Sequence, residues 1–161
     1  MPLDHIGLGR IEDVEKSREF YEQALAPLGY KVQMSFGKVY GFGPSPYSIP
    51  FWIADVNVRP SEVPIPITAG GQHVAFKGSR AQVHAFHEAA LQAGGKCNGP
   101  PGFRTNYHPF YYAAFVIDPS GNNIEVVNHG SGWQWLWYII GTKLGFVTPT
   151  ESYSDKDKKD D

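Results

Sequence analysis

The sequence repeats itself, and this internal repeat constrains the fold more than any other feature. The run His5–Leu8 matches His73–Phe76, with two extra residues in the first copy before the next shared positions. Further along, residues of the first half recur in the same order at one constant offset: Phe20, Glu22, Ala24, Leu25 and Gly29 as Phe86, Glu88, Ala90, Leu91 and Gly95. A repeat at a fixed offset indicates the duplication of one supersecondary unit.

Each copy is predicted to run as a strand, a helix and then further strands. A short apolar stretch, Leu3–Leu8, precedes a helix that Asp13 caps and that extends to about Pro27. In the second copy Ser79 and Gln82 have the spacing of a capping box. Strand-like runs follow at 30–34, 38–42, 50–56, 111–117 and 123–128. These signals predict an α+β fold.

Composition excludes several classes of protein. The 161 residues suffice for one domain, and 14 Lys and Arg against 16 Asp and Glu argue against a nucleic-acid surface. Cys97 is the one cysteine, so no intrachain disulfide can form. The first residues lack the pattern of a signal peptide, and the longest apolar stretch, Trp133–Ile140, is shorter than the roughly 18 residues that span a bilayer. We expect a cytoplasmic protein without stable membrane insertion.

We expect a main domain over 1–130, an aromatic extension over 131–149 and a disordered charged tail over 150–161. The domain divides into modules 1–57 and 70–130, and a Pro- and Gly-rich stretch, 59–71, is the predicted linker. In the extension Trp133, Trp135 and Trp137 alternate, which would place them on one face of an extended chain. Three uses stay open: a lid, a homodimer interface, or contact with a membrane surface.

Three residues have the character of metal ligands. Glu125 lies in an apolar strand, where a carboxylate is costly to bury unless it is paired, protonated or bound to a cation. His5 and His73 occupy matching points of the two copies, so they can converge if the copies pack with approximate two-fold symmetry. Two imidazoles and one carboxylate suit Fe, Zn, Mn, Co or Ni and leave positions open for substrate. The alternative is two core histidines and a solvent-facing glutamate.

The segment 99–112 has the composition of a small-ligand pocket, with aromatic side chains and few polar groups. His108 is predicted to transfer a proton, and Tyr107 or Tyr112 to donate to a developing oxyanion. Because Tyr111 and Tyr112 are neighbours on a strand, at most one of them points into the pocket. The alternative is a hydrophobic loop that closes one end of the fold.

Four residues are predicted to bind the substrate. Arg104 can hold a carboxylate or enolate oxygen with two parallel hydrogen bonds, and Phe103 adjoins it in the same segment. Tyr40 and Trp52 come from strand-like runs of the first half.

Three segments together resemble the vicinal oxygen chelate superfamily, which includes glyoxalase I, extradiol dioxygenases, and the fosfomycin- and bleomycin-resistance proteins. They are His5, Gln72–Phe76 and the stretch Asp118–Glu125, whose Asp-Pro-x-Gly-Asn turn before a strand glutamate is the most specific element. The resemblance covers residues 1–129. It implies two βαβββ modules whose mixed sheets form a cup around a divalent metal bound by His5, His73 and Glu125.

The chain departs from glyoxalase I in one respect. That enzyme has a fourth ligand, a glutamate on the last strand of its first module, whereas the matching strand Pro50–Asp55 has an aromatic or aliphatic residue there. Asp55 comes a few residues too late. The resemblance therefore implies a metal-dependent lyase, isomerase or dioxygenase that is not a standard glyoxalase I. Its substrate would be a small molecule that chelates the metal through vicinal oxygens.

Two further points follow from the resemblance. The alternative function is a metal-free small-molecule binding or resistance protein of the bleomycin-resistance type, although such relatives usually lack the three ligands. Modules of this type pair within a chain or by exchange between chains, so we expect a homodimer.

Overall fold

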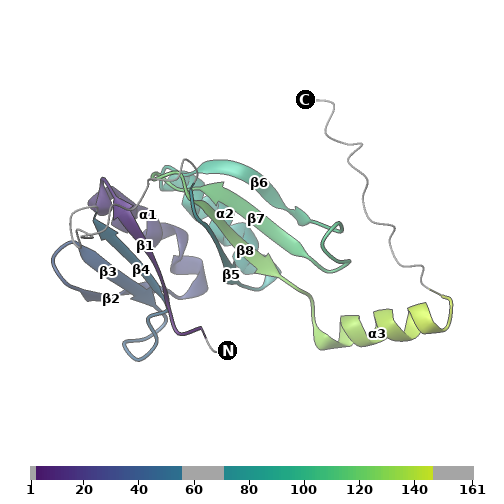
Figure 1. The fold of residues 1–161 in the computed structure, drawn as a ribbon. Helices are drawn as coiled ribbons and strands as arrows, with labels where there is room; N and C mark the ends of the chain where they lie inside the picture. Colours follow the sequence, from purple (N-terminus) through teal and green to yellow (C-terminus); the bar gives the residue numbers. More distant parts are fainter. Residues whose placement is uncertain (1–2, 56–70, 147–161) are drawn as a thin grey trace, which may run out of the picture.

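The computed structural model describes residues 3–55 and 71–146 of the chain. The predicted charged tail 150–161 and nearly all of the predicted linker lie outside these residues. The first module contains β1 (Ile6–Ile11), α1 (Val14–Ala24), the 3-10 turn η1 (Ala26–Leu28), β2 (Lys31–Ser35), β3 (Val39–Gly43) and β4 (Phe51–Asp55). The second contains β5 (His73–Lys77), α2 (Arg80–Gln92), β6 (Lys96–Phe103), β7 (Tyr112–Ile117) and β8 (Asn123–Asn128), followed by α3 (Gly132–Lys143; Figure 1).

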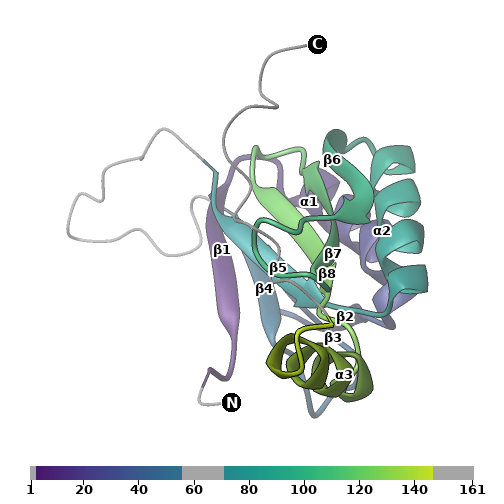
Figure 2. The same cartoon turned by 90° about the vertical axis from the view of Figure 1, so that its right-hand side faces the viewer.

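The two modules have the same topology, as the repeat predicts. The first sheet has the strand order β1-β4-β3-β2 and the second the order β5-β8-β7-β6. In each sheet the first and last strands of the module pair in parallel, and the other pairs are antiparallel. These two βαβββ modules confirm the predicted α+β fold. Helix α2 packs on its own sheet and against α1, so the helices meet between the modules (Figure 2).

Local signals place the helices where the sequence predicts them. The side chain of Asp13 accepts a hydrogen bond from the backbone N–H of Lys16, and Ser79 and Gln82 form the expected capping box. α1 ends at Ala24, earlier than predicted, because the chain tightens into η1 and then turns at Gly29 with φ 78°. Gly29 thus adopts the left-handed conformation that glycine favours.

Two segments differ from the prediction. The first half of the predicted pocket segment lies in β6, which pairs with β7 through two irregularities of register, and the one between Gly99 and Gly102 accommodates Pro100 and Pro101. The aromatic extension is helical rather than extended, and Ser131 with Gln134 forms a second capping box at its start. Within residues 3–55 and 71–146, no helix combines the length and hydropathy that crossing a bilayer requires.

Aromatic side chains form the centre of the core and join the modules. Tyr21 of α1 contacts Phe51 of β4, with the ring centroids 4.8 Å apart. Phe51 in turn contacts Phe76 of β5 edge to face at 5.3 Å. All three side chains are buried. Such edge-to-face pairs stabilise by about 0.5–1.5 kcal/mol each beyond the area that they bury.

One buried carboxylate links the modules through hydrogen bonds. Asp118 accepts from the hydroxyl of Tyr21 at 2.5 Å and from the backbone N–H groups of Ser120 and Asn122 at 2.9 and 2.7 Å. The Asn122 side chain donates to the same carboxylate and accepts from the backbone N–H of Gln72 at 3.0 Å. Asp118 therefore connects α1, the turn before β8 and the start of β5.

The Tyr21 hydroxyl is expected to stabilise the fold measurably. Burial and the adjacent Asp118 raise the pKa of Tyr21 well above its ordinary value, so the hydroxyl remains a donor. Tyr21→Phe removes this donor from a buried carboxylate, and the free energy of unfolding should fall by about 1–3 kcal/mol in urea titrations. Tyr107→Phe is the control, because Tyr107 is 63% exposed. Equal stability of the two variants would contradict the role of the Tyr21 hydroxyl.

Candidate functional site

His73 and Glu125 meet on the exposed face of the second sheet. The parallel pairing of β5 and β8 places His73 opposite Asn123 and Ala75 opposite Glu125, so both side chains project from the same face. The Nε2 atom of His73 lies 3.2 Å from Oε2 of Glu125. The carboxylate is only 2% exposed. Its other oxygen accepts a hydrogen bond from the hydroxyl of Tyr111 at 2.6 Å.

The hydrogen bonding of His73 determines what its Nε2 can do. Nδ1 lies 3.0 Å from the carbonyl oxygen of Asn123, which can only accept, so Nδ1 carries a proton. In the neutral ring, Nε2 then presents a lone pair to the Glu125 carboxylate. Two acceptors face each other favourably only with a proton or a cation between them. Ligand atoms that share one metal ion at bond lengths of about 2.0–2.2 Å and ordinary angles lie roughly 3.0–3.5 Å apart.

His5 has a similar arrangement on the first sheet. It precedes β1 directly, and its Nδ1 lies 2.6 Å from Oδ1 of Asp4. The carboxylate orients the ring and leaves Nε2 available, as is usual for histidines that bind metals.

A single chain does not bring the three predicted ligands together. Among residues 3–55 and 71–146, no group of three His, Cys, Asp or Glu side chains is close enough to hold a metal ion. The predicted set is thus divided into a pair on the second sheet, His73 and Glu125, and one residue on the first sheet, His5.

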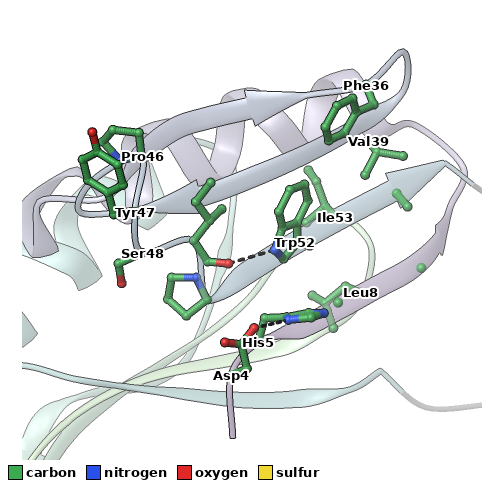
Figure 3. A pocket seen from close by; sticks show the side chains of 15 residues that line it. Asp4, His5, Leu8, Phe36, Val39, Pro46, Tyr47, Ser48, Trp52 and Ile53 are labelled. Atoms are coloured by element: carbon green, nitrogen blue, oxygen red, sulfur yellow. Dashed lines mark hydrogen bonds and ion pairs between the residues drawn. The ribbon is translucent and has the colours of Figure 1, made fainter.

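The first sheet carries a cavity of about 840 Å³ beside His5 (Figure 3). Its lining is mostly apolar and aromatic and includes Phe36, Tyr47, Ile49 and Trp52. Trp52 stacks against Phe36 at 6.4 Å and an interplanar angle of 7°, and its Nε1 donates to the carbonyl of Ile49 at 2.8 Å. An aromatic wall with few polar groups is typical of a site for a small organic ligand.

Strand register explains why the first module lacks a ligand that corresponds to Glu125. Gly7 pairs with Trp52 in the first module, and Ala75 pairs with Glu125 in the second. Gly7 and Ala75 each lie two residues after their histidine, so Trp52 occupies the position equivalent to Glu125. The nearest carboxylate, Asp55, is buried and forms an ion pair with Lys38 at 3.1 Å.

His108 lies in a cluster that the sequence predicts only in part. Its Nε2 is 2.8 Å from Nδ1 of His129, and its ring contacts Tyr111 edge to face. Burial, followed by the nearby His129, lowers the pKa of His108, so the ring is neutral near pH 7. Tyr107 is exposed beside the Tyr111 ring, with the centroids 4.7 Å apart.

Sequence reasoning missed His129 and the role of Tyr111. Both follow from the pairing of β7 with β8, because Tyr112 pairs with Asn128 and the residues just outside this pair must also be close. Burial and the bond to Glu125 raise the pKa of Tyr111, which keeps its hydroxyl a donor.

Three predicted site residues lie on the helix side of their sheets. The hydroxyl of Tyr112 is 2.7 Å from Nε2 of His84 on α2, Tyr40 donates to Glu15 of α1, and Phe103 lies under the guanidinium of Arg80. These contacts direct Tyr112, Tyr40 and Phe103 toward the helices rather than toward His5 or Glu125. Side-chain alternation along the strands accounts for the difference, since Tyr111 and Tyr112 must face opposite ways.

Arg104 lies on the same face as His73. Its guanidinium donates to the carbonyl groups of Pro100 and Phe103 at 2.8 and 3.2 Å and covers the ring of Phe115 at 5.5 Å. The Phe115 ring also stacks against His73 at 6.4 Å.

Comparisons with known proteins agree with this architecture. The family model described as Glyoxalase/Bleomycin resistance protein/Dioxygenase superfamily matches residues 3–126. The crystal structure of a glyoxalase/bleomycin resistance protein from Albidiferax ferrireducens T118 is 30% identical, with a TM-score of 0.59 over 77% of this chain and 95% of that chain. A search of curated proteins found no match.

Two more distant structures share the fold. A glyoxalase-related enzyme from Fulvimarina pelagi is 20% identical, with a TM-score of 0.55 over 79% of this chain and 87% of that chain. A glyoxalase/dioxygenase from Nostoc punctiforme is also 20% identical, with a TM-score of 0.53 over 80% of this chain and 91% of that chain.

The bond from Tyr111 to Glu125 is open to a direct test. Tyr111→Phe removes a donor from a carboxylate that is almost fully buried. The free energy of unfolding should fall by about 1–3 kcal/mol, or roughly 3–10 °C in Tm by calorimetry. Tyr107→Phe is the matched control, because that hydroxyl belongs to an exposed neighbouring side chain. If the two variants have the same Tm, the Tyr111 hydroxyl does not stabilise the fold through Glu125.

The His108 ring should titrate below the ordinary histidine value of 6.5. NMR titration of the imidazole proton on Cε1 measures this pKa directly. His129→Gln should raise it only part of the way, because burial is the larger cause and remains. A wild-type pKa at or above 6.5, or an unchanged value in the variant, would contradict the coupling between the two rings.

Proposed function

Because the chain belongs to the Glyoxalase/Bleomycin resistance protein/Dioxygenase superfamily, we propose that it is a divalent-metal-dependent enzyme. Its substrate is a small molecule that chelates the metal through vicinal oxygens, and its chemistry is of the lyase, isomerase or dioxygenase type. The observation that carries the proposal is the 3.2 Å separation of Nε2 of His73 and Oε2 of Glu125. Both are donor atoms, and the spacing suits two ligands of one ion.

The donor set suits Fe, Zn, Mn, Co or Ni. Imidazole and carboxylate ligands bind all of these ions, and the hydrogen bond from each histidine Nδ1 leaves Nε2 free for a metal. Tyr111 holds the second oxygen of Glu125 and so fixes the orientation of the carboxylate. The Glu125 environment therefore supports a metal ligand rather than a solvent-facing side chain.

His5 completes the set from a second copy of the chain. Within one chain His5 belongs to the first sheet, while His73 and Glu125 belong to the second. A homodimer with two-fold symmetry that places the first sheet of one protomer beside the second sheet of the other makes two identical three-ligand sites. We therefore propose a homodimer in which each site uses both protomers.

When held by His5, His73 and Glu125, a metal ion would supply Lewis-acid stabilisation of negative charge on the substrate oxygens. The side chains of the protein bind the substrate and move its proton. Trp52 and Phe36 bind the apolar part of the substrate and exclude water. We assign proton transfer to the pair formed by His108, neutral near pH 7, and His129. Nδ1 of His108 accepts a hydrogen bond from the backbone N–H of Phe110 at 3.2 Å, so its Nε2 donates to His129 across 2.8 Å. Tyr107 and Arg104 donate hydrogen bonds to substrate oxygens.

The second candidate is a metal-free small-molecule binding protein of the bleomycin-resistance type. The large aromatic cavity favours it, as does Trp52 in the position equivalent to Glu125. Retention of all three donor residues favours the enzyme. Either protein would act in the cytoplasm, where the exposed thiol of Cys97 stays reduced.

Metal analysis of mixed dimers tests the shared site. His5→Ala and Glu125→Ala are each expected to lose nearly all bound metal. A heterodimer of the two variants, co-expressed with two different non-metal affinity tags, regains one intact site and should hold about half of the wild-type content. The heterodimer of His73→Ala and Glu125→Ala is the control, because every site in it lacks one ligand.

The outcomes separate the candidates. Wild-type protein without stoichiometric metal, and with a Tm that no added ion raises, would favour the binding protein. Stoichiometric metal without recovery in the first heterodimer would contradict sharing of the site between protomers.

A further inference from the structure

We propose that α3 is an interface helix whose outer face packs against the first module of a second copy of the chain, over the open end of the cavity beside His5. The proposal rests on the homodimer of the proposed function and adds to it a wall of the substrate pocket. The family model ends at residue 126, so α3 lies beyond the matched residues. We define the outer face as Trp133, Leu136, Trp137, Ile140 and Leu144.

The inner side of α3 is attached to its own protomer. Trp135 packs edge to face on Phe110 at 5.2 Å, and Tyr138 contacts the same ring at 5.7 Å. The indole N–H of Trp135 donates to the carbonyl of His129 at 2.9 Å. These contacts fix the orientation of the helix, which leaves the end of β8 and extends beyond the second sheet (Figure 1).

The outer face is apolar, continuous and uncovered. Its residues recur at intervals of three and four, which aligns them along one side of a helix. Trp133, Trp137 and Leu144 are 71%, 67% and 63% exposed. At about 200 Å² for a large aromatic side chain, the two indoles alone expose roughly 280 Å², and the aliphatic residues extend the patch. Such a patch is at the upper end of what monomers expose, and it would form a substantial part of an 800 Å² interface.

The arrangement that we propose for the dimer decides what α3 meets. It places the first sheet of one protomer beside the second sheet of the other, with the strands of the two sheets antiparallel where they meet. α3 begins beyond the carboxyl end of β8, so in this arrangement the residues that precede the partner's β1 lie at the level of α3. These are the segment up to His5 and, because β4 is parallel to β1, the loop 44–50 before β4.

The expected contact surface has the chemistry to receive this helix. Tyr47 of the loop is 98% exposed and Leu3 is 70% exposed. Tyr47 stands at the rim of the cavity, away from Trp52 (Figure 3). An apolar helix placed there would cover Leu3 and, at the rim of the cavity, Tyr47. A membrane surface is disfavoured, since Lys143 is the one basic residue between 131 and 146.

The test removes the two tryptophans that face outward. Trp133→Ser combined with Trp137→Ser leaves the inner contacts of α3 intact, so the protomer should fold as before. Loss of two interface tryptophans should raise the dimer Kd at least about 100-fold in sedimentation velocity experiments over a dilution series. Leu91→Ser combined with Phe103→Ser is the control, because both residues are partly exposed apolar side chains on the helix side of the second module.

Hydrogen exchange locates the contact. In the wild-type dimer the backbone amides of 44–50 should exchange more slowly than in the Trp133→Ser, Trp137→Ser variant, and the control variant should match the wild type. Tyr47→Ser should weaken the dimer from the opposite side of the same contact.

Three results would overturn the proposal. They are an unchanged dimer in the tryptophan variant, a weakened dimer with unchanged exchange over 44–50, and a wild-type monomer that binds phosphatidylcholine vesicles through α3. Failure of the proposed function would give a different result. A protein that binds no metal can still dissociate into monomers when the two tryptophans are replaced. Conversely, shared metal sites in a dimer whose Kd does not change when the two tryptophans are replaced would contradict only the role of α3.

Discussion

The buried carboxylate of Asp118 is the interaction on which the candidate site depends. It joins Tyr21 of the first module to the turn that leads into β8, and Asn122 of that turn holds the residue before His73. The two predicted ligands of the second sheet thus take their relative positions from one hydrogen-bonded unit. Because this unit also anchors α1, the packing between modules and the spacing of His73 and Glu125 are set together. A buried carboxylate with several donors is costly to rearrange, which makes the spacing rigid.

The repeat explains both the likeness and the difference of the two modules. Equivalent strands place a histidine at the same point in each, and in each the Nδ1 forms a hydrogen bond, which leaves Nε2 as the atom that can bind a metal. The residue that pairs with the second position after the histidine differs: it is Glu125 in the second module and Trp52 in the first. The second module thus carries the predicted ligand pair, and the first carries an aromatic cavity wall. The proposed site needs one surface of each kind, so it depends on how the modules pair.

The aromatic residues of the chain fall into two groups with different tasks. Phe51 and its neighbours fill the core, where they join the modules. Those near the end of β8, including Trp135 and Tyr111, surround the histidine pair and connect it to α3. Helix α3 therefore starts at the site itself. An interface formed by its outer face would couple the assembly of the dimer to the environment of His108.

The sequence alone determined what local signals carry: the order of elements apart from β6 and α3, both predicted helix caps, the turn before β8, and His5, His73 and Glu125 as distinctive polar residues. Caps and turns depend on residues a few positions apart, and the repeat made the histidines stand out. Only the tertiary structure decided which side chains share a face. It brought Tyr111 rather than Tyr112 to Glu125, added His129, and divided the three ligands between two sheets. Those outcomes depend on strand register and long-range packing, and a shift of one residue reverses the face that a side chain occupies.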